Sequence, residues 1–182
     1  MNPPELAEVL LVPKARIGAL VGEKGKTKKL IERKTHSRIL IDSDSGEVEI
    51  HSKEENSEGF HKAERIVKAI ARGFSPQNAL LLLDEENFLE IIELDEFTGK
   101  SSKKMHSKKG RIIGREGKIR EKIEKSTGAR ISVFGKTIAL IGGIEEIEKA
   151  RNAVEKLLHG ASHESLNDYL MKKERMGKKF EL

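Results

Sequence analysis

The stretch Val21–Lys26 reads VGEKGK, and 92 residues later Ile113–Lys118 reads IGREGK. The same offset matches the residues that follow, as in Ile31 and Ile123, Glu32 and Glu124, Thr35 and Thr127, and Arg38 and Arg130. Further on the match resumes at an offset of 87, where Gly73 corresponds to Gly160. The first copy therefore carries five extra residues between its two matched blocks. A repeat at one offset with one change of length predicts a duplicated domain.

Both copies show the same order of hydrophobic patterns. The first predicts strands at 6–12, 37–41 and 47–50, a basic amphipathic helix at 26–35 and a closing helix at 60–71. The second predicts strands at 88–94, 130–134 and 137–141, with helices at 118–127 and 144–158. A further short helix is expected to end at each Gly-x-x-Gly. Each copy therefore predicts a small α+β domain.

The repeat also sets the expected domain boundaries in a chain of 182 residues. We expect a first domain at residues 1–75 and a second at 76–162. The second carries an inserted polar segment at 99–109, predicted as a short helix. Residues 163–182 lie outside the repeat and are expected to form a basic helical tail with a mobile end.

Positive charge gathers around both copies of the motif. Residues 14–38 hold nine Lys and Arg against two acidic residues, and residues 101–130 hold eleven against three. Residues 76–100 hold one positive and seven acidic residues, so the blocks are distinct from the rest of the chain. Two basic blocks, each centred on the repeated motif, favour a polyanionic partner over ordinary solvated lysines.

The composition argues against several classes of function. The chain has no cysteine, so it can form neither a disulfide nor a thiolate metal site, and a reducing, cytoplasmic location is expected. No apolar run is long enough for a membrane span, and the N-terminus lacks a signal-peptide pattern. His159 and His163 are four residues apart, but Gly160 interrupts any helix that would align them. We therefore expect no metal, no cofactor and no catalytic residue.

A nucleotide-binding P-loop is the nearest enzymatic alternative. The residues Gly25-Lys26-Thr27 resemble the end of that motif, but its first glycine would fall at position 20, which is Leu20. The preceding segment also has helical rather than strand periodicity, and the second copy has Ile119 where a Ser or Thr would hold Mg²⁺. The sequence therefore argues against an NTPase.

A Gly-x-x-Gly between two helices suits the binding of a phosphate backbone. Neither glycine has a Cβ, so the main chain can pass close to a ligand. The helix that follows offers free N–H groups and the positive end of its dipole. Lys26 and Lys118 add positive charge immediately after the second glycine.

Both copies resemble K-homology (KH) domains of type I, whose signature is [Ile/Val]-Gly-x-x-Gly-x-x-[Ile/Leu]. Residues 112–119 fit it closely, whereas the first copy has Lys28 where the signature has an apolar residue. The resemblance covers about residues 6–160. It implies two tandem α+β domains, each a three-stranded antiparallel sheet with helices packed on one face. It also implies binding of single-stranded RNA, with the loop gripping about four nucleotides beside an apolar groove.

The resemblance assigns roles to particular residues. The expected RNA-binding set comprises Gly22, Glu23, Lys24, Gly25, Lys26, Arg111, Ile113, Gly114, Arg115, Glu116, Gly117, Lys118, Ile131 and Val133. Lys24, Lys26, Arg115 and Lys118 would hold phosphates. The first groove would be lined by Ile17, Leu20, Val21, Ile39 and Ile41, and the second by Ile112, Ile113, Ile131 and Val133. Because Lys108, Lys109 and Arg111 approach the second loop, the second domain is expected to be the principal clamp and the first a helper.

A narrower resemblance is to the archaeal and eukaryotic "partner of Nob" ribosome-assembly factors. It is carried by the Gly110–Lys118 motif, by residues 131–137 and by the Gly160–Ser165 turn. It implies binding near the 3′ end of precursor small-subunit rRNA as a monomer. The implied partners are the Nob endonuclease and the alpha subunit of archaeal translation initiation factor two. A protein-interaction scaffold, or a general adaptor for mRNA, tRNA or the RNA-degradation machinery, remains the alternative.

Overall fold

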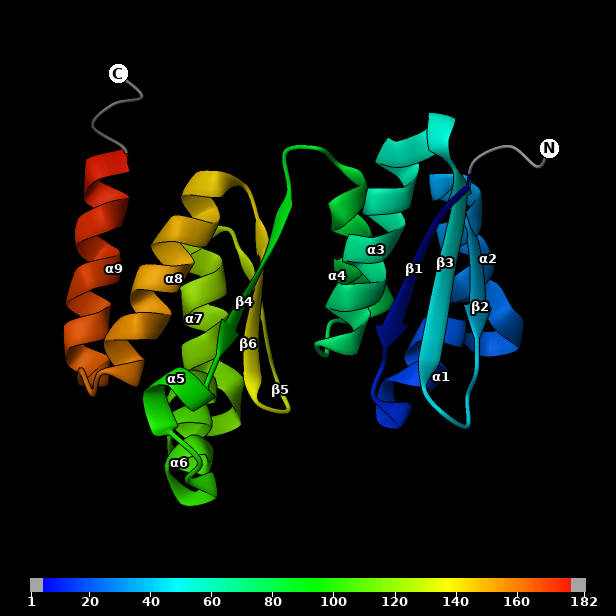
Figure 1. Cartoon of the computed structure of the whole chain (residues 1–182). Coiled ribbons are helices and arrows are strands. Elements are labelled where there is room, and N and C mark those ends of the chain that lie inside the picture. The colour runs from blue at the N-terminus through cyan, green and yellow to red at the C-terminus, as the bar shows by residue number, and fades with distance from the viewer. Residues whose placement is uncertain (1–4, 178–182) are drawn as a thin grey trace. The chain divides into compact units, whose positions relative to one another are not determined.

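The computed structural model describes residues 5–177 and shows two compact units, divided between Leu89 and Glu90. Each unit has its own three-stranded sheet and its own helices (Figure 1). The expected α+β class, with two three-stranded antiparallel sheets, is confirmed.

The first unit follows the predicted order of elements. It comprises β1 (Glu5–Leu11), α1 (Lys14–Val21), a single turn at Glu23–Gly25, α2 (Lys26–Thr35), β2 (Arg38–Ile41), β3 (Glu47–Lys53), a turn at Glu54–Asn56, α3 (Ser57–Ala71), α4 (Pro76–Ala79) and a turn at Leu80–Leu83. The strand order is β1-β3-β2, with both pairings antiparallel.

The sheet of this unit has one buried face because β3 alternates strictly. Val48, Ile50 and Ser52 are buried, whereas Glu47, Glu49 and Lys53 are exposed and His51 is half-buried. The amphipathic helix α3 covers the buried face with side chains spaced three and four residues apart, which are Phe60, Ala63, Ile66, Val67 and Ile70. The closing helix and the central strand thus form the core that the hydrophobic pattern predicts.

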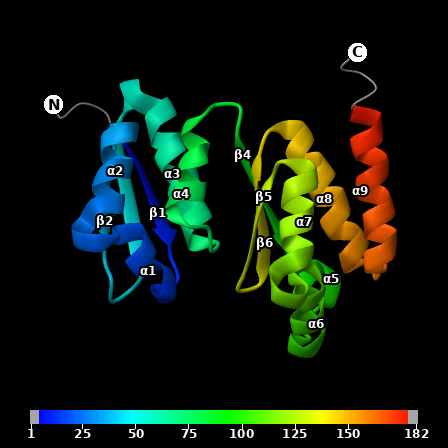
Figure 2. The ribbon, with the colours of Figure 1, turned by 180° about the vertical axis from the view of Figure 1, so that it is seen from behind.

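The second unit repeats this arrangement. It comprises β4 (Phe88–Glu93), α5 (Asp95–Thr98), α6 (Ser102–Ile113), a turn at Arg115–Gly117, α7 (Lys118–Thr127), β5 (Arg130–Phe134), β6 (Thr137–Gly142), α8 (Ile144–Leu158) and α9 (His163–Gly177). The strand order is β4-β6-β5. The helices α7, α8 and α9 pack against one another and lie beside this sheet (Figure 2).

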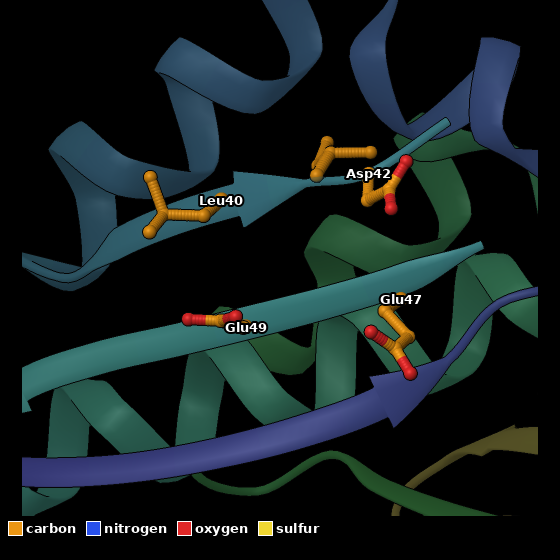
Figure 3. A pocket seen from close by; sticks show the side chains of 5 residues that line it. Leu40, Asp42, Glu47 and Glu49 are labelled. Atoms are coloured by element: carbon orange, nitrogen blue, oxygen red, sulfur yellow. The ribbon is translucent and has the colours of Figure 1, made fainter. Parts of the chain in front are cut away.

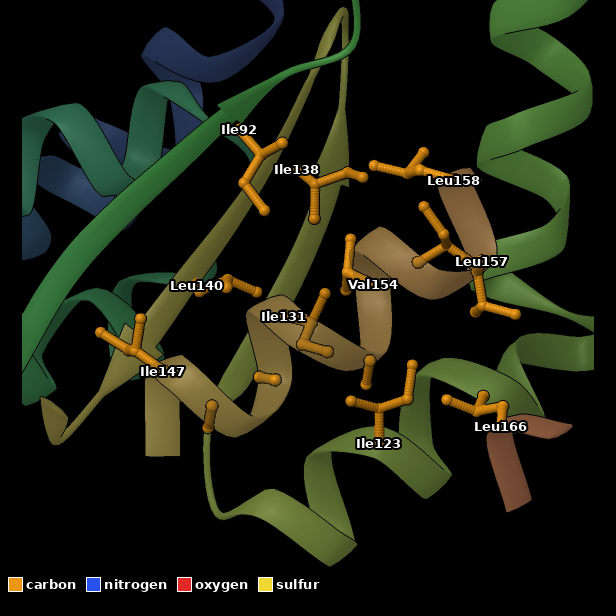
Figure 4. Packing of buried hydrophobic residues seen from close by; sticks show 14 of the residues in the cluster. Ile92, Ile123, Ile131, Ile138, Leu140, Ile147, Val154, Leu157, Leu158 and Leu166 are labelled. Atoms are coloured by element: carbon orange, nitrogen blue, oxygen red, sulfur yellow. The ribbon is translucent and has the colours of Figure 1, made fainter. Parts of the chain in front are cut away.

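The core of the second unit joins the sheet to these three helices. Ile131 of β5 and Ile138 and Leu140 of β6 point toward Val154 and Leu157 of α8 (Figure 4). Ile123 of α7 and Leu166 of α9 close the cluster from the other side. The helix α9 is therefore part of this unit rather than an appendage.

The inserted segment differs from the expected short helix at 99–109. β4 ends in the four-residue helix α5, and α6 then runs without interruption from Ser102 to Ile113. Ser101 caps α6 by accepting a hydrogen bond from the N–H of Lys104 at 3.3 Å. The insertion therefore lengthens the helix that leads into the second loop.

The repeat extends further than the sequence comparison indicates. Gly73 and Gly160 both end a closing helix at a φ near +98° and +99°. Two residues later, Ser75 and Ser162 each accept a hydrogen bond from a backbone N–H three residues on, at 3.3 and 3.1 Å. The short helix α4 and the longer helix α9 thus begin at equivalent positions with the same cap.

These following helices explain where the units divide. Ala79 and Leu82 are fully buried in contact with α3, so residues 76–83 pack on the first unit rather than opening the second. Leu166 and Leu170 are buried against α7 and α8. The expected boundary after residue 75 therefore differs from the observed one, and the segment expected as a tail is folded. The end of that tail, residues 178–182, lies outside the described residues, as do residues 1–4.

Candidate nucleic-acid interface

Both Gly-x-x-Gly loops have the same backbone conformation. The first glycines, Gly22 and Gly114, have a φ of +71° with an extended ψ. The two residues before the next helix are left-handed, with Lys24 and Glu116 at φ 52° and 54° ahead of the second glycines. Each loop is therefore a tight turn of three residues that leads directly into a helix.

The two glycines of each loop serve different purposes. A Cβ on Gly114 would lie 2.3 Å from Cγ1 of Ile119, and one on Gly22 would lie 2.3 Å from Oγ1 of Thr27. A Cβ on the second glycine, Gly117, would meet nothing closer than the Glu121 carboxylate at 3.9 Å. The first glycine is thus required by packing within the loop, and the second faces open space where a ligand can approach.

The helices α2 and α7 begin at the second glycine and present free donors there. Gly25 and Gly117 occupy the N-cap positions, where neither can supply a side-chain cap. The first-turn N–H groups of α2 and α7 therefore have no side-chain acceptor at the cap. Together with the positive end of the helix dipole, they suit an anionic ligand such as a phosphate.

Each loop carries one glutamate and one cation in opposite order. The Glu23 carboxylate lies 3.5 Å from Nζ of Lys26, and the Glu116 carboxylate lies 3.3 Å from Nζ of Lys118. All four side chains are about three-quarters exposed, so these pairs are weak and a phosphate can displace the glutamate. Lys24 and Arg115 are exposed at the loop tips.

Thr27 and Ile119 are equivalent residues, which corrects the expected difference between the two signatures. They are 92 residues apart, and each lies where a Cβ on the first glycine of its loop would collide with it. Lys28 is therefore the counterpart of Arg120 and not of Ile119. Both of these cations pair with a glutamate one turn on, at 3.2 and 3.9 Å. The second copy does not have the fuller signature, because the two loops share the same pattern.

The glutamates in those pairs also tie each loop helix to the neighbouring edge strand. Glu32 accepts a hydrogen bond from the N–H of Ile39 at 2.8 Å, and Glu124 accepts one from Ile131 at 2.7 Å. The sequence shows that Glu32 matches Glu124 but does not by itself reveal this hydrogen bond. Their recurrence at the common offset was the available signal.

The aliphatic residues expected to line the grooves fall into two groups. Val21 and Ile41 are half-buried, and Val133 is half-buried at the position equivalent to Ile41. Ile113, the counterpart of Val21, is 36% exposed. These four side chains remain accessible to a ligand beside each loop.

The other residues predicted to line the grooves are buried in the core. They are Ile17, Leu20, Ile39, Ile112 and Ile131. Ile131 is only 3% exposed, because α7 and α8 cover the middle of β5 with Ile123 and Val154 (Figure 4). Val133 lies on the same face but nearer the strand end. Ile131 thus supports the groove from beneath and does not line it.

The cations expected to approach the second loop are held by main-chain carbonyls. The Arg111 guanidinium donates to the carbonyl oxygens of Gly160 and Ala161 at 3.1 and 2.6 Å. Lys109 donates to Gly135 at 2.9 Å, and Lys108 donates to Leu158. These contacts stabilise the end of α8 and the β5–β6 turn. Arg111 was expected to bind RNA, and the structure shows in addition that its guanidinium stabilises the end of α8.

The first unit neutralises the equivalent helix end with one arginine. Arg16 of α1 donates to the carbonyl oxygens of Ile70 and Phe74 at 2.8 and 2.5 Å. Burial lowers the pKa of Arg16 from its ordinary value, but a guanidinium stays charged. The cation that stabilises the end of each closing helix therefore comes from the helix that precedes the loop.

The open face of the first sheet is unsuited to a polyanion. A depression of about 310 Å³ is lined by Leu40, Ile41, Asp42, Glu47 and Glu49 (Figure 3). Hydrogen bonds from the backbone of Asp44 and from Ser45 hold the pKa of Asp42 below its ordinary value, so this carboxylate stays charged. Phosphate binding is therefore expected on the helical side of the unit, at the loop.

The structure also bears on the alternative sites. The segment before Gly22 is the helix α1, whereas a P-loop follows a strand. His163 contacts the carbonyl oxygen of Arg111 at 3.1 Å, and His159 packs edge-on against Phe97. Among residues 5–172, whose side chains are described, no three His, Cys, Asp or Glu side chains gather as a metal site would require. No helix in this described part is long and apolar enough to cross a membrane.

Comparison with family models identifies both units. A model described as "Eukaryotic type KH-domain (KH-domain type I)" matches residues 88–175, and one described as "KH domain" matches residues 7–69. The first of these matches includes most of α9, in agreement with its place in the core of the second unit.

Several known proteins resemble the chain over most of its length. The "KH domain-containing protein MJ0443" of Methanocaldococcus jannaschii is 43% identical over 165 residues, which cover 90% of this chain and 72% of that protein. A chain in the crystal structure of the a/eIF2alpha-aDim2p-rRNA complex from Pyrococcus horikoshii OT3 is 44% identical, with a TM-score of 0.87. That match covers 94% of this chain and 95% of the other.

A more distant resemblance extends to fungi. The "Pre-rRNA-processing protein PNO1" of Phaeosphaeria nodorum is 28% identical over 128 residues, which cover 70% of this chain and 49% of that protein. The chain thus spans about half the length of this fungal relative.

Proposed function

Because the chain belongs to the family of two-KH-domain proteins that includes Dim2p and PNO1, we propose that it binds single-stranded RNA without catalysing a reaction. The observation that carries this proposal is the pair of loops with the same backbone conformation. Each has an open second glycine, a free helix N-terminus and an exposed cation at its tip.

The binding mode follows from the loop geometry. The sugar-phosphate chain passes over Gly25 or Gly117, where a Cβ would point into open space. First-turn N–H groups donate hydrogen bonds to the phosphate oxygens, and Lys24, Lys26, Arg115 and Lys118 supply charge. Val21 with Ile41, and Ile113 with Val133, provide the accessible apolar contacts for bases.

The RNA we propose is the 3′ region of precursor small-subunit rRNA. Support comes from the relatives, since one is named as a pre-rRNA-processing protein and another occurs in a complex with rRNA. The same complex contains the alpha subunit of initiation factor two, which we propose as a protein partner here. A Nob-type endonuclease is the second partner proposed, with the chain acting as a cytoplasmic monomer.

Crosslinking in cells, followed by sequencing of the attached RNA, tests the RNA class. The proposal expects reads concentrated at the 3′ end of the small-subunit precursor. Recovery of mRNA or tRNA without precursor rRNA would contradict it and favour a general adaptor. An RNA-binding constant that does not change with salt concentration would instead favour a protein scaffold. Contacts with phosphates release counterions from the RNA, so they make binding weaker as salt increases.

A further inference from the structure

The outer face of α2 carries a basic depression that begins at the first loop. Its volume is about 420 Å³, and it is lined by Lys26, Lys29, Leu30 and Arg33. The three cations are exposed, and Leu30 is half-buried between them. Lys26 belongs both to the loop and to this face, so the two surfaces are continuous. We call these four residues the α2 ridge.

Two of the three cations of the ridge lack an ion-pair partner among the described side chains, whereas Lys26 has a weak exposed pair with Glu23 at 3.5 Å. Exposed cations on the closing helices pair with glutamates, as Lys68 does with Glu64 and Lys149 with Glu145. Among residues 5–172, whose side chains the structure describes, no hydrogen bond or ion pair is found for Lys29 or Arg33. The only acidic residue of α2 is Glu32, which is already bound by Lys28 and the Ile39 N–H.

The second unit does not have an equivalent surface. At the common offset, Lys29 corresponds to Glu121 and Leu30 to Lys122. The apolar floor is thus replaced by a lysine, and the middle cation is replaced by a carboxylate. The two copies have the same loop conformation but differ on this face.

The length of the ridge suits a polymer rather than a single ion. Lys26 and Arg33 are seven residues apart, which corresponds to about 10 Å along a helix. Three positive charges over this distance, of which Lys29 and Arg33 are unpaired within the described part of the chain and Lys26 is in a weak exposed pair, have an aliphatic side chain between them. This arrangement matches an extended strand that presents alternating phosphates and sugars. Acidic proteins would also be attracted, but the continuity with the phosphate-binding loop favours nucleic acid.

We propose that the α2 ridge binds the backbone of the nucleotides next to those gripped by the first loop. The first domain then contacts a longer stretch of RNA than the second, in a manner independent of base identity. This inference rests on the proposed RNA-binding function and extends it beyond the loops.

The full chain with Lys29→Glu and Arg33→Glu provides the test. Glutamate is the residue that the second copy has at the Lys29 position, so the fold is expected to tolerate it. Affinity is measured for RNAs from about four nucleotides, the length held by one KH domain, to about sixteen. Lys34→Glu, an equal charge change on the same helix outside the depression, is the control for each single substitution.

The expected result depends on RNA length. The double variant binds the shortest RNA as the unchanged protein does but binds the longest more weakly. Two lost phosphate contacts reduce the slope of log K against log salt by about 1.4, so the deficit shrinks about sevenfold between 50 and 200 mM salt. Equal affinities of the double variant and the unchanged protein for long RNA would overturn the proposal. A loss of affinity in Lys34→Glu equal to that in either single substitution, Lys29→Glu or Arg33→Glu, would also overturn it. Charge reversal at the loop tips tests the proposed function separately, so the two failures are distinguishable.

Discussion

The Glu124 carboxylate accepts a hydrogen bond from the backbone N–H of Ile131, with 2.7 Å between the two atoms. Glu32 and Ile39 repeat this contact at 2.8 Å in the first unit. Because β2 and β5 are edge strands, each glutamate satisfies a donor that the neighbouring strand does not reach. The contact fixes the helix that starts at the loop to the strand on the other side of the groove.

Removal of this acceptor is expected to destabilise the second unit. Glu124→Ala leaves the Ile131 N–H without its partner in a partly buried position, which costs about 1–3 kcal/mol of unfolding free energy. Glu124→Gln keeps an oxygen acceptor and is expected to lose less than half as much. Urea unfolding measures both. Equal losses in the two variants would show that the charge, and not the hydrogen bond, matters.

The two glycines of the second loop are expected to differ on substitution. Gly114→Ala places a methyl group 2.3 Å from the Ile119 side chain and 2.9 Å from its backbone nitrogen. Gly117→Ala meets no close atom and costs only the strain of a positive φ, about 1–2 kcal/mol. Thermal unfolding should therefore show a larger loss for Gly114→Ala. The reverse order would contradict the assignment of the first glycine to packing.

Breaking the ion pair in the second loop is expected to strengthen RNA binding. Glu116→Gln removes the carboxylate that lies 3.3 Å from Lys118, so the lysine is free for a phosphate. The slope of log K against log salt should steepen by about 0.7, the value for one added contact. Glu148→Gln on α8 makes the same charge change away from the loop and serves as the control. Weaker binding by Glu116→Gln would show that the glutamate itself contacts the RNA.

The helix α9 is expected to contribute to the stability of the second unit. Leu166 is fully buried in the core, so Leu166→Ala should cost about 2–5 kcal/mol of unfolding free energy. Met171 lies on the same helix but is 52% exposed, and Met171→Ala should change stability by less than about 0.5 kcal/mol. Similar small effects from both substitutions would show that α9 does not contribute to the stability of the second unit.

Much of the fold was accessible from the sequence because local patterns and tertiary packing agree. The alternation in β3 and the apolar stripe of α3 each identify one element and its buried face. The repeat then doubled every such observation. The end of each domain could not be predicted in the same way. After Gly73 and Gly160 the sequence identity between the two copies fades, although the same cap geometry continues.

The site was harder to predict because several residues have uses that only the fold reveals. Arg111 lies in a basic block, but it contacts carbonyls of residues 160 and 161, which are 49 and 50 positions away in the chain. Ile131 and Val133 share one face of β5, and only the position of α8 separates the core residue from the accessible one. From the sequence, Lys28 is a departure from the signature in the first copy. The structure shows that it pairs with Glu32 as Arg120 pairs with Glu124, so the two copies are equivalent at this position.

The central claim is that both loops grip the RNA backbone, and charge reversal at their tips tests it most directly. Lys24→Glu with Arg115→Glu changes two solvent-facing side chains and leaves all four glycines in place. Its affinity for a single-stranded RNA of about sixteen nucleotides is compared with that of Lys34→Glu with Lys125→Glu, which changes the charge equally in the last turns of α2 and α7. We expect the tip variant to lose at least about tenfold in affinity, with a shallower salt dependence, and the control to lose much less. Equal affinities in the tip variant, the control and the unchanged protein would contradict the claim.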